Sequence, residues 1–206
     1  MAVAGLLLLS VIPVLGGAFR LTDLAGGGIT PDNARFFDSP VPVVAHIVGA
    51  TVYTLLGAFQ FVPALRARRS WHRIVGRILI PAGLIAALSG MWMAAFYSFP
   101  EEDLGLVVAR LFFGGAMAAS IVLGVVAIVR RDFRAHGAWM TRAYALGVAA
   151  GTQAVVFGVW ILVAGSETGM PASVLLVVAW AINAVVAELV ILARLRRARA
   201  VRHAAA

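Results

Sequence analysis

Two segments of this sequence combine histidine with arginine in a way that suits cofactor binding. They are RARRSWHRIVGR at 66–77 and RRDFRAHGAWMTR at 130–142. Haem iron accepts two neutral imidazoles from neighbouring helices, and guanidinium groups match the geometry of the propionates. His72 and His136 are therefore candidate metal ligands. The neighbours that face propionates or pack on the ring in this hypothesis are Arg73, Arg77, Arg142, Trp139 and Met140.

A second set of polar residues recurs at one depth of the apolar blocks that contain these segments. Because a helix rises ~1.5 Å per residue, Gln60 and Glu188 each lie roughly 8 Å from the inner end of their block. Arg142 and Arg77 lie about a turn inside two other blocks. Charge in hydrocarbon is costly and usually faces a protein interior. We therefore predict that Arg142 pairs with Glu188 and that this layer and the two histidines form one polar site.

Three further polar residues lie deeper or on the outer side. Gln153 and Asn183 have comparable mid-membrane depth, where they either extend the polar path or, as we favour, hydrogen-bond to each other across helices. His46 lies near the outer end of its block. About 20 residues, or roughly 30 Å of helix, separate it from the inner end. His46 therefore cannot share a ligand with His72 and His136.

The composition places these residues in a membrane protein. Of 206 residues, 62% are hydrophobic and 13% are charged, whereas a soluble domain is about half apolar and about a quarter charged. The net charge of +8 comes from arginine alone, because the sequence has no lysine. The arginines lie at the ends of apolar blocks, which indicates membrane topology and not nucleic-acid binding. The absence of cysteine excludes disulfides and thiolate metal sites.

Six apolar blocks are long enough to cross a bilayer, which takes about 20 residues. The predicted spans are 2–19, 41–65, 74–97, 106–129, 138–164 and 172–193. Arginine is concentrated in the loops 66–73 and 130–137 and in the tail 194–206, and basic loops stay in the cytoplasm. The sequence therefore predicts one all-α integral-membrane domain over 1–206, a bundle of six transmembrane helices with both termini in the cytoplasm. Since 2–19 lacks a basic leading region, it reads as a retained helix.

Three segments in order form a distinctive pattern. They are His46 followed by GAFQFVPALRARRSWHRIVGRI at 57–78, LIAALSGMWMA at 84–94, and RRDFRAHGAWMTRAYAL at 130–146. Over about residues 42–155 the chain resembles a family of bacterial multi-pass membrane proteins, domain of unknown function 2306. The resemblance implies location in a bacterial inner membrane. It marks as its pattern His46, Gln60, His72, Arg73, Arg77, His136, Trp139 and Arg142. It also implies an arginine where this chain has Thr152 and Gln153.

The sequence leaves three functions open. The first is a b-type haem-binding redox module at the cytoplasmic-side His/Arg site, which passes electrons to or from a redox partner protein. The second is binding or transport of a small molecule, a lipid or a quinone, because arginine matches phosphate and carboxylate geometry. The third is a structural accessory membrane subunit. No HExxH, Walker or GxSxG motif occurs, and enzyme activity is left undecided. The lipid bilayer is the predicted partner, and nucleic acid is not.

Overall fold

The chain folds into helices throughout the ranges that the structure describes. The structure is a computed structural model, and it describes residues 2–98, 104–165 and 172–204. The helices in these ranges are α1 Ala2–Gly26, α2 Ala34–Asp38, α3 Pro40–Phe59, α4 Pro63–Ala67, α5 Arg69–Phe96, α6 Leu104–Val129, α7 Phe133–Gly147, α8 Ala149–Ala164 and α9 Ala172–Ala204. No strand accompanies them there, which confirms the all-α prediction.

Most of these helices are long and apolar enough to cross a membrane. Among the described residues, α1, α3, α5, α6 and α9 qualify singly, and α7 with α8 qualifies as a bent pair. The number of spans is therefore five, or six if the bent pair forms one broken span, which agrees with the six predicted blocks. Such helices require a lipid bilayer as their surroundings. The protein is a multi-pass membrane protein.

The predicted span 138–164 is not one continuous helix. α7 and α8 are bent by 44° at Val148, whose φ of −88° and ψ of 4° leave the helical region. Gly147 and Gly151 flank the break, and glycine is about 1 kcal/mol less favourable than alanine in a helix interior. Beyond the bend α8 packs against α1 and α9, whereas α7 packs against α6 and α9.

The predicted span 41–65 ends early, and proline is the reason. Val62 is extended, with φ −76° and ψ 117°, because the ring of Pro63 clashes with an α-helical residue before it. α3 therefore ends at Phe59, and Pro63 starts the short helix α4. Gln60, which the sequence placed roughly 8 Å inside the span, is the C-cap residue of α3.

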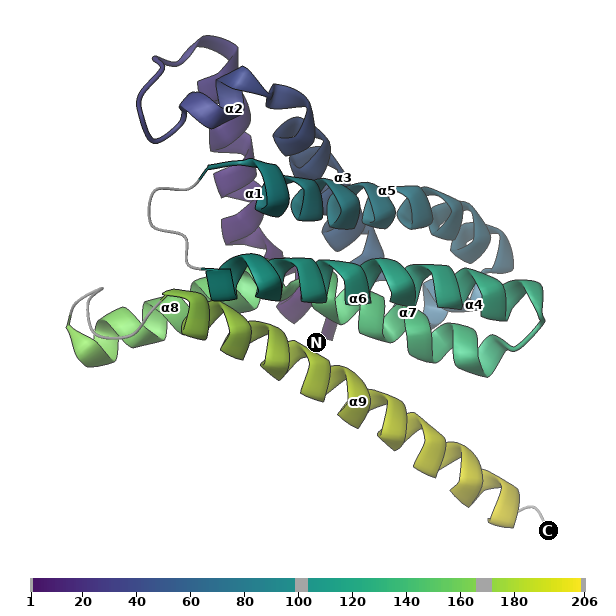
Figure 1. The fold of residues 1–206 in the computed structure, drawn as a ribbon. Coiled ribbons are helices and arrows are strands. Elements are labelled where there is room, and N and C mark those ends of the chain that lie inside the picture. The colour runs from purple at the N-terminus through teal and green to yellow at the C-terminus, as the bar shows by residue number, and fades with distance from the viewer. Residues whose placement is uncertain (1, 99–103, 166–171, 205–206) are drawn as a thin grey trace.

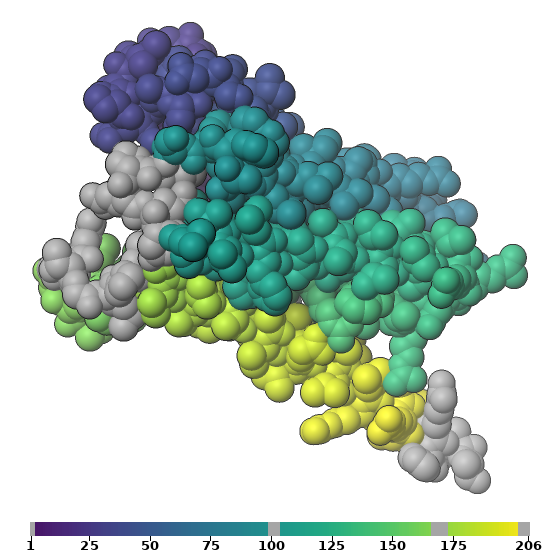
Figure 2. Space-filling view, viewed as in Figure 1, coloured from purple at the N-terminus to yellow at the C-terminus, as the bar shows by residue number. Residues whose placement is uncertain are grey.

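α9 continues well past the predicted end of its span. It has 33 residues, or about 50 Å of helix, so the predicted tail is helical to Ala204. α9 packs along α6, α7 and α8, and its last turns extend away from the other helices (Figures 1 and 2). Arg194, the first residue after the predicted span, still lies beside α7, where its Nη1 donates a hydrogen bond of 3.0 Å to Thr141 Oγ1.

The arginine-rich segments gather at one end of the bundle. This end, here called the arginine-rich end, holds α4, the start of α5 and the turn between α6 and α7 (Figure 1). The far end holds α2 and the starts of α6 and α9 (Figure 1). The basic connections between α3 and α5 and between α6 and α7 thus lie at the same end of the fold.

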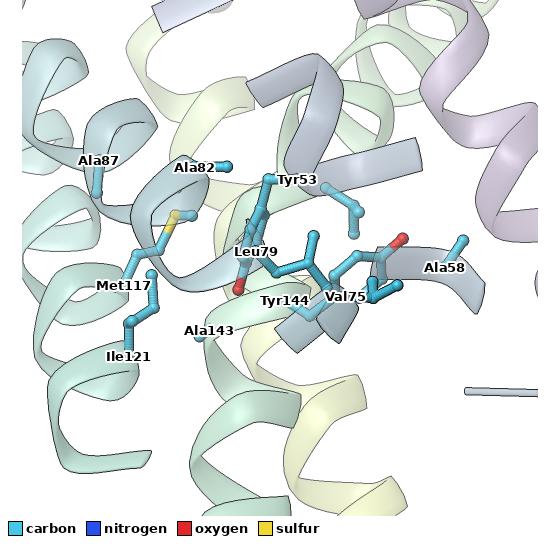
Figure 3. Close-up of a cluster of buried hydrophobic side chains, with 11 residues drawn as sticks. Tyr53, Ala58, Val75, Leu79, Ala82, Ala87, Met117, Ile121, Ala143 and Tyr144 are labelled. Atoms are coloured by element: carbon cyan, nitrogen blue, oxygen red, sulfur yellow. The ribbon is translucent and has the colours of Figure 1, made fainter. Parts of the chain in front are cut away.

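Two tyrosines lie in the core between α3, α5, α6 and α7 (Figure 3). The ring centroids of Tyr53 and Tyr144 are 5.9 Å apart, and the Tyr144 hydroxyl donates a hydrogen bond of 2.8 Å to the Thr54 carbonyl. Glycines give the rings their space. A Cβ at Gly57 would clash with the Tyr144 ring, and one at Gly83 would clash with the Tyr53 ring.

α1 packs on the side of the bundle against α3 and α8. In its most apolar window 6% of the residues are buried, compared with 28% to 33% in the corresponding windows of α3, α5, α6 and α9. Gly151 of α8 lies directly against the backbone carbonyl of Leu9, where no side chain would fit. A small residue at such a crossing lets two helices approach closely in lipid.

Candidate binding site at the arginine-rich end

A cavity of about 110 Å³, partly open to the surface, lies at the arginine-rich end. We call it the arginine-end cavity. Its walls come from α3, α4, α5, α6, α7 and α9 and comprise Tyr53, Gly57, Gln60, Phe61, Arg66, His72, Gly76, Leu79, Ile80, Ile121, His136, Gly137, Met140, Thr141, Tyr144 and Arg194. The enclosed space is smaller than the about 300–1,000 Å³ of typical small-molecule sites. A larger ligand would therefore extend through the open side of the cavity.

Both histidines of the two sequence segments line this cavity. Each lies in the first turn of its helix, His72 in α5 and His136 in α7. The Nδ1 of His136 is 2.9 Å from the Gly124 carbonyl oxygen. A carbonyl oxygen only accepts hydrogen bonds, so this nitrogen carries the proton and donates. The Nε2 lone pair of a neutral His136 is then available to a ligand or a metal ion.

The cavity also contains polar atoms that have no partner within the described part of the chain. Gln60 Nε2, Gln60 Oε1 and His72 Nδ1 are buried and form no hydrogen bond there. An unpaired buried polar atom costs about 1–3 kcal/mol, and most such atoms in folded proteins are paired. Gln60 reaches this position because Pro63 ends α3 beside the cavity.

Two arginines that sequence reasoning left outside the site also line the cavity. Arg66 belongs to α4, and Arg194 belongs to the extended part of α9. The Arg194 guanidinium lies 5.9 Å from the centroid of the Phe61 ring. The signal that could have found them is local: Pro63 starts a new helix, and the helical pattern of α9 has no glycine or proline to end it after 193.

Arg142 and Glu188 form the ion pair that their depths predict. Arg142 Nε lies 2.6 Å from Glu188 Oε1, and Arg142 Nη2 lies 3.0 Å from Glu188 Oε2. The same guanidinium lies 4.6 Å from the centroid of the Trp139 ring. The pair joins α7 to α9, and neither residue lines the arginine-end cavity. Its charges are used between two helices, which removes most of the cost of each charge in lipid.

The other arginines named in the haem hypothesis do not reach the cavity. Arg73 and Arg77 are exposed on α5 and are absent from the cavity wall. Their long side chains suit an interface between lipid and water. The structure thus brings together Gln60, His72, His136 and Met140 from the predicted set. It leaves outside that wall Arg73, Arg77, Trp139, Arg142 and Glu188.

The prediction that Gln153 and Asn183 hydrogen-bond to each other is wrong. Asn183 Oδ1 accepts a hydrogen bond of 2.8 Å from Thr152, and Asn183 Nδ2 donates one of 2.8 Å to the Ala145 carbonyl. The break at Val148 turns α8, so Thr152 takes the position facing α9 while Gln153 lines a second cavity. Asn183 therefore ties α9 to both halves of the broken span.

His46 lies away from the other two histidines, as the length of its block predicts. It lines the second cavity and is absent from the wall that contains His72 and His136. Its Nδ1 is 2.8 Å from the Ala86 carbonyl oxygen and, like that of His136, carries the donated proton.

A protein-family model described as "Predicted membrane protein (DUF2306)" matches residues 43–191 of this sequence, more than half of the chain. The chain belongs to the DUF2306 family. The resemblance seen over about residues 42–155 is thereby confirmed and extends to 191. No curated protein and no solved structure matches the chain.

The DUF2306 match covers the whole wall of the arginine-end cavity except Arg194. α1 and α2 precede the match. The residues that fix the shape of the cavity, including Pro63 and the two core tyrosines, lie within the matched range 43–191. The family match therefore includes most of the residues that build the cavity.

The wall chemistry suits binding of a negatively charged or hydrogen-bonding group. No acidic residue occurs among its described members. Guanidinium and amide groups supply donors, and the two imidazoles supply a donor or an acceptor each. Among the described residues, no group of three or more His, Asp or Glu could hold a metal ion. Two axial imidazoles are enough for haem iron, which needs no third protein ligand.

Proposed function

We propose that the arginine-end cavity binds a small amphipathic molecule with an anionic head, such as a phosphate or carboxylate, and an apolar body. The observation that carries the proposal is the set of unpaired buried atoms on Gln60 and His72. Each unpaired atom costs about 1–3 kcal/mol. A ligand that supplies hydrogen-bond partners would recover this free energy on binding.

The charge of the wall supports an anionic head. Arg66 and Arg194 enter from two different helices, and a guanidinium forms paired, charge-assisted hydrogen bonds with phosphate or carboxylate oxygens. Arg142 is not available for this role, because Glu188 already occupies its guanidinium.

The remaining wall supports an apolar body. Four apolar or aromatic residues also line the cavity, all from the hydrophobic core or packed against it: Leu79, Ile121, Met140 and Tyr144. Apolar surface removed from water contributes about 25 cal/mol per Å². An anionic lipid or a lipid-like acid combines both features.

Native mass spectrometry of protein released from membranes in mild detergent tests this function. We expect a bound small molecule on the wild type, with its mass and fragmentation separating lipid from quinone. Gln60→Leu and Arg194→Gln should each reduce occupancy about tenfold, since lost hydrogen bonds to a charged group are worth about 1.5–3 kcal/mol. Arg77→Gln, an exposed arginine of the same end, is the matched control. Equal occupancy in all four proteins, or none in the wild type, would count against the proposal.

Haem b is a second candidate ligand of the same cavity. The observation that favours it is the His136 Nδ1–H bond to the Gly124 carbonyl, since metal-ligating histidines usually donate their other nitrogen in this way. His72 would supply the second axial imidazole, and the bound haem would make the protein an electron carrier. An absorbance spectrum of the protein purified after expression with added haem tests whether haem is bound. A Soret band lost in His136→Ala and kept in His46→Ala supports haem, and a featureless spectrum rejects it.

We also infer that the arginine-rich end faces the cytoplasm of a bacterial cell. Basic connections between spans are retained on that side. Both termini would then be cytoplasmic, and the proposed site would take its ligand from the inner leaflet or from the cytoplasm.

A further inference from the structure

A second and larger cavity lies toward the far end of the bundle. Its volume is about 380 Å³, part of it open to the surface, and its walls come from α2, α3, α5, α6, α7, α8 and α9. We call it the far cavity. Tyr53 lines both this cavity and the arginine-end cavity. The two cavities thus lie on either side of one buried aromatic ring.

His46 presents a hydrogen-bond acceptor to the far cavity. Its Nδ1–H is donated to the Ala86 carbonyl at 2.8 Å, which fixes the proton on Nδ1 and leaves the Nε2 lone pair unprotonated in the neutral ring. Gly90 makes room for the imidazole, because a Cβ there would lie 3.1 Å from His46 Cε1. The ring is therefore held in one orientation by the packing of α3 on α5.

Other residues of the same wall supply donors and flat aromatic surface. Gln153 and the half-buried Arg110 line the cavity from α8 and α6. Phe113 and Trp180 also line it, with ring centroids 4.9 Å apart and planes inclined by 18°. Aromatic rings favour offset stacking at such separations. A planar ring with polar atoms at opposite edges would match these groups.

We propose that the far cavity is a second binding site, for a quinol or quinone ring. A hydroxyl of the quinol donates to His46 Nε2, and the oxygen on the other side of the ring accepts from Gln153. The ring packs on the wall formed by Phe113 and Trp180. This site is independent of the arginine-end cavity, whose wall lacks tryptophan and whose ligand is anionic.

Quenching of tryptophan fluorescence by a quinone tests the site, because Trp180 is the tryptophan in the wall of the far cavity. The probe is ubiquinone-1, titrated into the full-length protein in lipid nanodiscs. We expect a saturable quenching component in the wild type. Trp180→Phe should abolish that component, whereas Trp92→Phe, which removes a half-exposed tryptophan outside both cavities, should keep it.

Variants of the polar groups complete the test. His46→Leu and Gln153→Leu should each raise the dissociation constant of ubiquinone-1 at least about fivefold, the effect of roughly 1 kcal/mol per lost hydrogen bond. Gln153→Leu keeps the test valid if His46→Leu fails to fold. Gln60→Leu, in the arginine-end cavity, should leave the dissociation constant of ubiquinone-1 unchanged. The test of the far cavity is therefore separate from the test of the anion site in the arginine-end cavity. Non-saturable quenching, or equal constants in all variants, would overturn the proposal.

Discussion

The Arg142–Glu188 pair gives the sharpest prediction about stability. Its two hydrogen bonds, 2.6 Å and 3.0 Å long, connect α7 to α9. The side chains keep 30% and 48% of their surface exposed. In water, a pair this exposed would contribute only about 0.2–1 kcal/mol. In a transmembrane helix an uncompensated charge costs about 2.5–3.5 kcal/mol near the bilayer centre. The lipid environment therefore decides the magnitude.

We expect the single substitutions Arg142→Gln and Glu188→Gln each to destabilise the fold by about 2 kcal/mol. This is somewhat less than the cost of a charge at the bilayer centre, because the pair lies nearer one end of the bundle. Arg142→Gln should be the more damaging. It leaves a short carboxylate that cannot reach the interface, whereas Glu188→Gln leaves an arginine that can extend and still contact Trp139. In the double variant neither charge remains, so its cost should fall short of the sum of the two by about 1–3 kcal/mol.

The assay is the free energy of unfolding measured in bicelles for the wild type, the two single variants and the double variant. Arg77→Gln serves as the control for removal of an arginine from the same end of the bundle. A coupling energy within error of zero would show that the two side chains do not interact in the membrane, and the contact between α7 and α9 would need another explanation.

Three further predictions concern packing and orientation. Gly151→Leu should displace α1, because a side chain at this position meets the Leu9 backbone. We expect the free energy of unfolding to fall by about 1–3 kcal/mol. The control is Gly158→Leu on the same helix, which has open space around its Cβ and should change the free energy of unfolding little. Asn183→Leu should cost about 0.6–1.7 kcal/mol in the same assay by releasing both halves of the broken span, and no measurable cost would contradict this role. A green fluorescent protein fused to the C-terminus should fluoresce while alkaline phosphatase inserted after Gly27 should be active, and the reverse pattern would invert the proposed orientation.

The sequence predicts the helices well because apolar length is a strong signal, and it predicts their ends poorly. A run of 27 mostly apolar residues at 138–164 gives no contrast at Val148, so the break there is not visible in hydropathy. The early end of α3 is foreseeable from Pro63 and the restricted residue before it. The sequence does not predict the extension of α9, because arginines after 193 suit both a solvated tail and a helix.

The candidate site is predicted in part for a physical reason. Depth along each helix places Gln60 and Arg142 in one layer with His72 and His136 just below it, but depth does not tell which way a side chain points around its helix. Arg142 therefore shares their level yet faces α9, while Arg194 enters the cavity from a position assigned to the tail. Rotation about the helix axis is set by packing between helices, which a single sequence does not contain.

The most direct test of the central claim is a high-resolution density map of the wild-type protein in nanodiscs made from its native lipids. The claim is that Gln60 and His72 face a ligand inside the bundle at its arginine-rich end. We expect non-protein density within hydrogen-bonding distance of both side chains, extending toward Arg66 or Arg194. A cavity closed by these side chains bonding to one another, with no density between them, would contradict the claim.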